Sequence, residues 1–408
     1  MIKTIQDVII IGAGASGLMC AIKLGEKGVK ALVLEGQGRP ARKLLMTGGG
    51  RCNITNAVVK ENDYGTQCHR IVRHVLRTFS PKDVVFFFEH RGIDLVLEED
   101  GKYFTADGRA SKVVDVLVNV AEAVGAKILC GHRVESVSFF DGCFILKAAG
   151  QEFRARNIVV TTGGLSYPET GSNGAGFAIA KGFGHKIITT IPALVPLLTD
   201  DKTYSTLSGL TLSAGLSLWS SGRKMSVYEG SFLFTHVGFS GPVVMDMSRD
   251  FQKAPADKRL AADFAPVIPE GEIEARLMDH TSRLGVIARL GEMIPKRLAG
   301  FLALRAKVDT EGPANLLKRG ERQYLLSLIK EHPLPISGTA GFHKAEATSG
   351  GVDLNELQGA SLESKLQPGL FFAGEVLDVD GRVGGFNLQW AWASGVAAAQ
   401  GILRRNKW

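Results

Sequence analysis

Near its N-terminus the chain has a run of apolar residues followed by closely spaced glycines, and this feature constrains the fold more than any other. Residues 7–11 (DVIII) lack polar alternation, which is the pattern of a parallel strand buried on both faces. Residues 12–17 (GAGASG) follow, apolar residues then recur at helical spacing, and a second apolar run at residues 29–34 ends at Glu35. The order of strand, glycines, helix, strand and acid predicts the βαβ unit of a dinucleotide-binding fold.

Each glycine of this unit has a physical role. Gly12 permits the tight turn, Gly14 lets the backbone approach a pyrophosphate, and Gly17 lets the helix pack closely on the strand. The phosphates then lie at the helix N-terminus, where free N–H groups and the dipole favour negative charge. Glu35 is placed to accept hydrogen bonds from ribose hydroxyls, which disfavours a 2′-phosphate. We therefore predict a bound ADP moiety, against the alternative of a glycine-rich turn in an ordinary α/β protein; the motif does not separate FAD from NAD.

Glycines at the ends of two distant strands favour FAD. Residues 369–373 form an apolar run that ends in Gly374 and Glu375, a placement that suits the ribityl chain that FAD has and NAD lacks. Residues 384–387 (GGFN) open the last helix, whose N–H groups favour negative charge on a reduced flavin. Residues 161–164 (TTGG) end a middle strand. Taken alone, Glu375 is explained equally well as a surface acid, and its context favours the ribityl contact.

The pattern of the remaining chain predicts the architecture. Short alternating runs between residues 191 and 263 indicate an antiparallel β-domain, and residues 269–330 have helical spacing. We predict an α/β protein with a Rossmann-like FAD-binding domain, an inserted antiparallel β-domain and a helical cap. The predicted boundaries are 1–190 with 345–408 for the FAD domain, 191–265 with 331–344 for the β-domain, and 266–330 for the cap.

Composition narrows the class of protein. The 408 residues include 48 Lys+Arg and 41 Asp+Glu, and the net charge of +7 is compatible with an anionic partner or with a solvated basic surface. The five cysteines contain no C-x-x-C pair and no H-E-x-x-H motif is present, so we predict neither a disulfide framework nor a metal site. No apolar stretch reaches the length of a membrane span, and we expect a cytoplasmic enzyme that does not insert into a membrane.

Five blocks of sequence carry a family resemblance: residues 42–56, 162–168, 233–242, 345–357 and 374–392. Over essentially its whole length the chain resembles the BaiN/RdsA-type NAD(P)/FAD-dependent oxidoreductases. The resemblance implies FAD as cofactor, a three-part architecture and a cytoplasmic bacterial enzyme. Members of this family are associated with reducing a ring double bond in steroid-like acids, reducing a uridine of ribosomal RNA, and oxidising small amino ketones.

Two candidate catalytic residues lie in these blocks. Arg42, Lys43 and Arg51 can neutralise a pyrophosphate or a reduced flavin, unless their glycine-rich loop is merely flexible. Cys52, beside Arg51, is a candidate general acid with raised thiolate character, or else a buried packing residue. His236 is a candidate proton donor or nicotinamide contact, or else satisfies carbonyls in a tight turn.

Beyond these, a larger set is predicted to bind the cofactor. The complete set is Gly12, Gly14, Ala15, Ser16, Gly17, Glu35, Arg42, Lys43, Gly49, Gly50, Arg51, Cys52, Asn53, Val134, Thr162, Gly163, Gly164, Gly374, Glu375, Asp380, Gly384, Gly385, Phe386 and Asn387.

Our leading hypothesis is a flavoenzyme that NADH or NADPH reduces and that passes hydride to an electron-poor C=C bond of a small molecule or of ribosomal RNA. Because only one complete dinucleotide fingerprint exists, the nicotinamide nucleotide must enter transiently. The alternatives are an oxygen-dependent oxidase of a small amine or amino ketone, and a non-catalytic flavin-carrying module that binds RNA or protein. An RNA substrate is favoured by basic residues that could equally form solvated helix faces: Arg70, Arg73, Arg77, Lys82, Lys296, Arg297, Lys318, Arg319, Arg404, Arg405 and Lys407.

Overall fold

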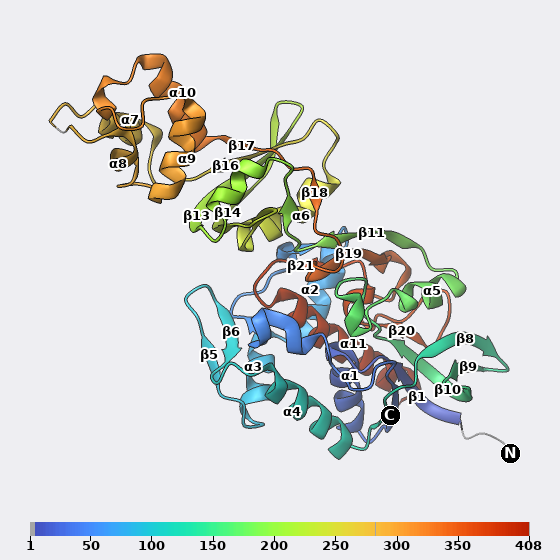
Figure 1. Ribbon diagram of the computed structural model, residues 1–408. Coiled ribbons are helices and arrows are strands. Elements are labelled where there is room, and N and C mark those ends of the chain that lie inside the picture. Colours follow the sequence, from blue (N-terminus) through green and yellow to red (C-terminus); the bar gives the residue numbers. More distant parts are fainter. Residues whose placement is uncertain (1–4, 282, 408) are drawn as a thin grey trace. The chain divides into compact units, whose positions relative to one another are not determined.

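The computed structural model describes residues 5–281 and 283–407, and the chain divides into two compact units (Figure 1). Unit 1 comprises Met1–Pro192 and Phe342–Trp408, and unit 2 comprises Ala193–Gly341. Each unit has its own hydrophobic core. The sheet and the helices of the inserted segment both belong to unit 2.

Unit 1 is built on a mixed sheet in the order β7-β2-β1-β10-β9-β8, with β20 also paired to β10. The pairs among β7, β2, β1, β10 and β20 are parallel, and the β8–β9–β10 part is antiparallel. The bounds of the sheet strands are β1 Ile5–Ile11, β2 Ala31–Leu34, β7 Lys127–Leu129, β8 Val134–Phe140, β9 Cys143–Ala148, β10 Gln151–Val160 and β20 Leu370–Phe372. The predicted α/β Rossmann-like class is confirmed.

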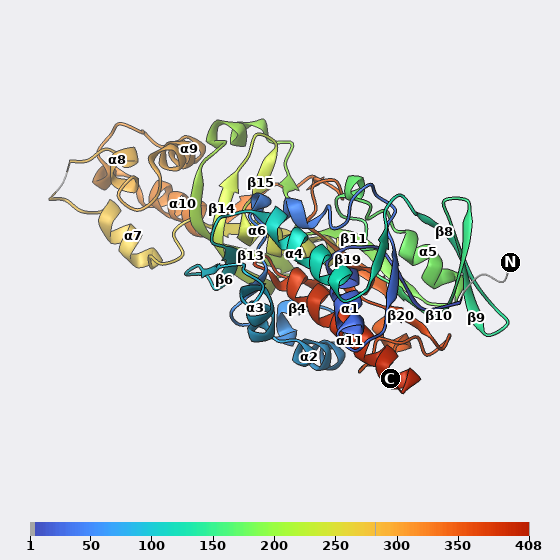
Figure 2. The ribbon, with the colours of Figure 1, turned by 90° about the horizontal axis from the view of Figure 1, so that it is seen from below.

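Helices cover this sheet and bury their apolar faces on it. The first and last helices, α1 (Ala15–Gly25) and α11 (Phe386–Asn406), lie side by side (Figures 1 and 2). Their close approach requires glycine, because a Cβ at Gly395 would lie 2.4 Å from the Ser16 carbonyl oxygen. The other helices of unit 1 are α2 His69–Thr78, α3 Pro81–Glu89, α4 Ala110–Ala123 and α5 Ala175–Gly182.

Further strands and 3₁₀ turns outside the main sheet complete unit 1. The short strands are β3 Thr55–Asn56, β4 Tyr64–Gly65, β5 Leu95–Leu97, β6 Lys102–Thr105, β11 Ile187–Ala193, β19 Ala347–Val352 and β21 Asp380–Gly381. The 3₁₀ turns of unit 1 include η1 (Leu44–Gly50) and η7 (Gly374–Val376).

Unit 2 is an antiparallel sheet with its own helices. The strand order is β17-β16-β13-β14-β15-β12-β18. The bounds are β12 Leu197–Leu198, β13 Thr211–Ser220, β14 Arg223–Phe234, β15 Gly238–Ser240, β16 Arg259–Asp263, β17 His332–Leu334, β18 Gly338–Thr339, α6 Pro242–Lys253, α7 Glu270–Leu277, α8 Val286–Leu290, α9 Lys296–Ala306 and α10 Arg319–Lys330. No helix in the described ranges, 5–281 and 283–407, is long and apolar enough to cross a membrane.

The core of unit 2 contains a buried polar pair. His332 is completely buried among aromatic rings, and its Nε2 lies 2.7 Å from the Tyr204 hydroxyl. Burial, together with the nearby Arg305 charge, lowers the pKa of His332 to about 4. The imidazole is therefore neutral in the folded unit at neutral pH.

Candidate functional site

Three segments that are far apart in the sequence meet at one edge of the unit 1 sheet. Strands β1, β10 and β20 are parallel neighbours, and the register pairs Ile11 with Val160 and Val160 with Phe372. All three strands therefore end at the same level, and the glycine-rich turns that follow them lie together. The carboxyl edge of such a sheet is where α/β proteins bind their ligands.

The glycine fingerprint has two positions that the fold requires and one that it does not. A Cβ at Gly12 would lie 2.7 Å from the Thr161 carbonyl oxygen, and one at Gly17 would lie 2.1 Å from the Gly12 carbonyl oxygen. In contrast, a Cβ at Gly14 would meet no protein atom within 4 Å, and its φ of −80° suits any residue. Packing therefore explains glycine at 12 and 17 but not at 14.

Gly14 is also the N-cap of α1 and no side chain caps this helix end. Ala15 and Ser16 form the first turn, and Gly374 of η7 packs on it, since a Cβ at Gly374 would lie 2.5 Å from Ser16 Oγ. A Cβ at Gly14 would thus project into open space at the uncapped start of α1, and we call this space the cradle. This cradle fits the pyrophosphate of a dinucleotide.

Glu35 is held beside this cradle by backbone donors. Its Oε2 accepts a hydrogen bond from the Ala13 N–H and its Oε1 from the Gln37 N–H, each 2.7 Å long. Arg42 donates to the Gln37 side chain at 2.6 Å. Val134 begins β8 and is buried. The structure therefore orients the predicted ribose acid, while Arg42 interacts with Gln37.

Lys43, Ser166, Thr348 and Glu375 form a polar cluster next to the turns that follow β10 and β20. The sequence alone did not predict that these residues meet. Lys43 Nζ donates to Glu375 Oε2 and to Ser166 Oγ, both at 2.5 Å. The Thr348 N–H donates to Glu375 Oε1 at 2.9 Å, and Ser166 Oγ donates to the same oxygen. Both Glu375 oxygens are thus engaged by protein groups, so the carboxylate belongs to an ion-paired cluster with Lys43.

The functional residues that sequence reasoning missed in this cluster are Ser166 and Thr348, both completely buried. They fall inside the blocks at residues 162–168 and 345–357 that carry the family resemblance. This membership was the one feature of the sequence that pointed to a role for them. Nothing in their local spacing indicates that they meet.

The turn after β10 packs closely on this cluster. A Cβ at Gly164 would lie 2.5 Å from Thr348 Oγ1, and one at Gly163, where φ is +73°, would lie 2.6 Å from Ser172 Oγ. Thr162 Oγ1 is buried and has no hydrogen-bond partner within the part of the chain that the structure describes. The neighbouring backbone is therefore held tightly, and the Thr162 hydroxyl packs toward α5, where a Cβ at Gly176 would lie 2.2 Å from it.

The N-terminus of α11 is tied to the loop that follows η1. With its amide oriented to satisfy both neighbours, Asn53 donates to the Thr55 carbonyl and accepts from the Gly385 N–H, each at 3.0 Å. Asn56 donates to the Gly384 carbonyl at 3.1 Å. A Cβ at Gly385, where φ is +90°, would lie 2.6 Å from the Thr55 carbonyl oxygen. The helix end therefore needs glycine to approach this loop.

Three further predicted residues lie at this helix end. Asn387 accepts from the Gly381 N–H at 2.8 Å and donates to its carbonyl at 3.1 Å. Phe386 is buried, and Asp380 is buried in β21. Together these residues fix the turn that precedes α11.

The glycine run of η1 contains a second open position. Gly48, Gly49 and Gly50 all have positive φ, between +57° and +90°. A Cβ at Gly49 would meet no protein atom within 4 Å. As at Gly14, the fold leaves space for a ligand next to the backbone.

Arg51 and Cys52 point in different directions. The Arg51 guanidinium lies 3.9 Å from the centre of the Phe104 ring, pairs with Glu98 at 2.7 Å and is half exposed. Cys52 is completely buried, and burial raises the pKa of its thiol to about 12. The expected thiolate character is therefore wrong in direction, because desolvation outweighs any effect of the arginine.

His236 belongs to unit 2, whereas every other predicted site residue belongs to unit 1. It lies in the short connection between β14 and β15 and is exposed. Within the described ranges, no group of three or more His, Cys, Asp or Glu side chains is arranged to hold a metal ion.

Comparisons with known proteins agree with this geometry. The model of the HI0933-like protein Rossmann domain matches residues 6–401. The chain is 33% identical over 404 residues to the ribosomal RNA dihydrouridine synthase of Escherichia coli K12, covering 97% of this chain and 98% of the relative. It is 30% identical over 404 residues to the 3-dehydro-bile acid delta(4,6)-reductase of Clostridium scindens, covering 97% and 98% respectively.

Among solved structures, Mycobacterium smegmatis Sdh1 in complex with UQ1 has a TM-score of 0.51 at 16% identity, covering 100% of this chain and 70% of that one, which shows a shared fold. The chain therefore belongs to the HI0933-like Rossmann family and is a flavoprotein oxidoreductase.

Proposed function

We propose that this chain is an FAD-dependent reductase that takes electrons from NADH or NADPH and saturates an electron-poor C=C bond. The observation that carries the proposal is the open space at Gly14, at the uncapped N-terminus of α1, where a Cβ would meet no protein atom within 4 Å. The two relatives described above support the choice of bond, because their names describe a dihydrouridine synthase and a delta(4,6)-reductase.

The chain's own residues would divide the work of binding. Gly14 and the first turn of α1 would hold the pyrophosphate, and Glu35 would accept from ribose hydroxyls. The first-turn N–H groups of α11 that follow Gly385 would favour negative charge, since the N-cap glycine has no side chain to accept from them. When bound, FAD supplies the hydride chemistry that no side chain can perform.

The Lys43–Glu375 pair would orient this edge of the site. It is mostly buried, with side-chain exposures of 24% and 19%, so removing either partner would leave the other without its counter-charge in a mostly buried place. Its positive member would sit close to where negative charge develops during reduction.

The acceptor that we propose first is a uridine of ribosomal RNA, with an unsaturated ring compound second. The E. coli relative's name and the net charge of +7 support RNA. The fold alone does not discriminate between these substrates, because one fold hosts many chemistries.

The first experiment is anaerobic spectroscopy of the purified holoprotein. We expect the visible absorption of oxidised flavin to bleach on addition of NADH or NADPH, and to return when ribosomal RNA that lacks dihydrouridine is added. Return with an unsaturated ring compound but not with RNA would select the small-molecule substrate. A flavin that stays oxidised with both nucleotides, or peroxide release from an amine without either, would contradict the reductase.

The proton donor can be separated from the hydride step by two variants. We expect His236→Asn to slow C=C reduction by about 100-fold, the usual contribution of a general acid, while bleaching by NAD(P)H is unchanged. We expect Cys52→Ala to have a much smaller effect, because a buried thiol with a pKa of about 12 is a weak donor. Rapid-mixing measurement of both half-reactions tests this, and the reverse ranking would assign the proton to Cys52.

A further inference from the structure

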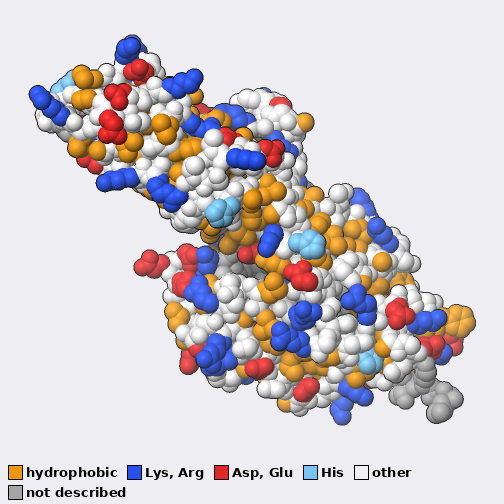
Figure 3. All heavy atoms as spheres, viewed as in Figure 1, with side chains coloured by type: hydrophobic (Ala, Val, Ile, Leu, Met, Phe, Trp, Pro, Cys, Tyr) orange, Lys and Arg blue, Asp and Glu red, His pale blue; other side chains and the backbone are white. Residues whose placement is uncertain are grey.

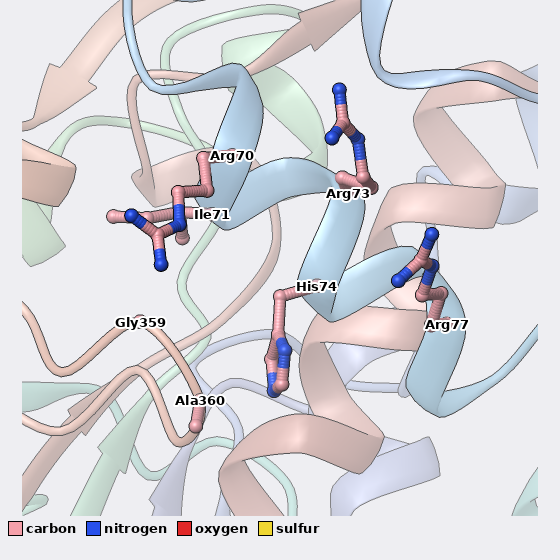
Figure 4. Close-up of a pocket in the computed structure, with 7 residues that line it drawn as sticks. All are labelled: Arg70, Ile71, Arg73, His74, Arg77, Gly359 and Ala360. Carbon is pink, nitrogen blue, oxygen red and sulfur yellow. The ribbon is translucent and has the colours of Figure 1, made fainter.

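A surface pocket of about 350 Å³ lies beside α2, within unit 1 and built from elements outside the cofactor site (Figure 4). Its lining residues are Arg70, Ile71, Arg73, His74, Arg77, Gly359 and Ala360. Four of these seven residues have basic side chains, and no acidic residue lines the pocket.

The spacing on α2 explains why the basic side chains gather. Residues 70, 73, 74 and 77 follow the i, i+3, i+4, i+7 pattern of one helix face. On the opposite face Val72, Val75 and Leu76 are buried in the unit 1 core. The helix is therefore anchored by its apolar face and presents a cationic face to solvent.

The positive charge of this face is only partly compensated. Arg73 pairs with Glu61 at 2.5 Å, and this contact lowers the pKa of the Glu61 carboxyl. Among the described residues no salt bridge within 4.0 Å joins Arg70 or Arg77 to an acid, although the Arg77 charge also helps to lower the pKa of the Glu61 carboxyl. Arg404 of α11 adds another guanidinium at the rim, where it donates to the Ala360 carbonyl at 3.1 Å.

The shape of the pocket fits a chain of anions better than a single one. Arg70 and Arg77 are seven residues apart, about 10 Å along the helix axis. Two guanidinium groups at this separation suit two phosphates of one nucleic-acid strand better than a single anion. On the face drawn in Figure 3, by comparison, Lys and Arg side chains are dispersed among Asp and Glu.

The floor of the pocket is apolar and closely packed. It is formed by Ile71 and the Gly359–Ala360 turn, and a Cβ at Gly359 would lie 3.3 Å from Ile71 Cγ1. In Figure 4, Arg70 and His74 point toward this turn from the helix. Arg73 and Arg77 point away from this turn in the same view, so they lie on the outer part of the helix face, where arginine can bind phosphate oxygens bidentately.

We propose that this pocket binds the phosphodiester backbone of a single RNA strand, with separate phosphates of that strand on Arg70 and Arg77. The inference rests on the proposed function, in which RNA is the substrate class, and it assigns the contact that positions that RNA. Phosphate contacts carry no sequence information, so recognition of the target base belongs elsewhere in the protein.

The test measures RNA binding by the oxidised holoprotein, with no reductant present. A fluorescein-labelled single-stranded RNA of ribosomal sequence is titrated at several KCl concentrations and followed by fluorescence anisotropy. For Arg70→Gln/Arg77→Gln we expect the slope of log K against log salt to fall by about 1.4, at about 0.7 per lost phosphate contact, which corresponds to roughly 20-fold weaker binding at 0.1 M salt.

The matched control removes the same charge elsewhere. Arg223 and Arg283 are exposed arginines of unit 2, and Arg223→Gln/Arg283→Gln is expected to change the slope by much less. Arg70→Lys/Arg77→Lys keeps the charge and should recover most of the affinity, and the absorption spectrum of the bound flavin in the glutamine variant checks that this variant is folded. Equal losses in the pocket and control variants, no loss in the pocket variant, or no RNA binding by the wild-type protein would overturn the assignment.

Failure of this inference and failure of the proposed function are separate results. Bleaching of the flavin by NAD(P)H needs no RNA, so it tests the reductase alone. If the flavin bleaches normally but the pocket variant binds RNA as tightly as the wild type, the proposed reductase function stands and the proposed RNA contact is refuted.

Discussion

Gly14→Ala is expected to fold normally and to lose FAD. The added Cβ meets no protein atom within 4 Å and the backbone at Gly14 is extended, so the apoprotein has no reason to be destabilised. The methyl group would occupy the cradle at the N-terminus of α1 and displace the pyrophosphate from the first-turn N–H groups. Loss of charge-assisted hydrogen bonds there costs about 3 kcal/mol, or roughly 100-fold in affinity.

Gly17→Ala is the matched control, since it adds the same methyl group three residues away. Its Cβ would lie 2.1 Å from the Gly12 carbonyl oxygen, so α1 must move off the strand. We expect this variant to destabilise the apoprotein by about 3 kcal/mol. Urea unfolding of the apoproteins and quenching of FAD fluorescence during titration measure the two effects. Normal FAD binding by Gly14→Ala, or equal destabilisation by both variants, would refute the proposal that the pyrophosphate binds next to Gly14.

We expect the free energy of unfolding of unit 2 to fall at acid pH because of His332. His332 has a folded-state pKa of about 4 against an ordinary value of 6.5, because burial disfavours the imidazolium. Between these values the unfolded chain binds a proton that the folded unit does not. The stability from this group is therefore complete above pH 6.5 and is lost as the pH falls through 4, by about 3 kcal/mol in total.

The pH effect can be isolated with His332→Gln, which keeps a polar group beside the Tyr204 hydroxyl but does not titrate. Urea unfolding between pH 7 and pH 4 should give a steeper fall in stability for the wild type, since other acid-sensitive groups are common to both proteins. Hydrogen exchange in β16 and β17 would localise the loss to unit 2. Parallel stability curves for the two proteins would show that His332 is not the cause.

Sequence patterns predicted the local parts of the fold well. The apolar run at residues 7–11 lies in β1, the glycine turn leads into α1, and the last helix begins at Phe386 as the GGFN segment indicated. These features depend on neighbours a few residues apart, so periodicity and glycine placement carry the information. Strand β10 begins earlier than its apolar run, because its first half pairs with β9 and needs no burial on both faces.

The candidate site was only partly predictable, because its polar cluster is made by tertiary packing. Ser166 and Glu375 are 209 residues apart, and Thr348 comes from a third segment. No local spacing reports such a meeting. Cys52 shows the same limit: adjacency to Arg51 in the sequence indicated a charged environment, whereas the backbone turns the thiol inward and the guanidinium toward Phe104.

Strand β10 pairs with β9 along its first half and with β20 at its end, and the second pairing affects the order in which the protein can fold during synthesis. Its end, Ile158–Val160, pairs with β20 at Leu370–Phe372, and the whole of unit 2 lies between them in the chain. During synthesis unit 2 emerges complete before β20 does, so it is free to fold while the edge of β10 is still unpaired. The closing strand and α11 arrive last, and they bring Glu375 and Gly385 with them. The cofactor edge can therefore form only after unit 2 and the segment up to Gly385 have been synthesised.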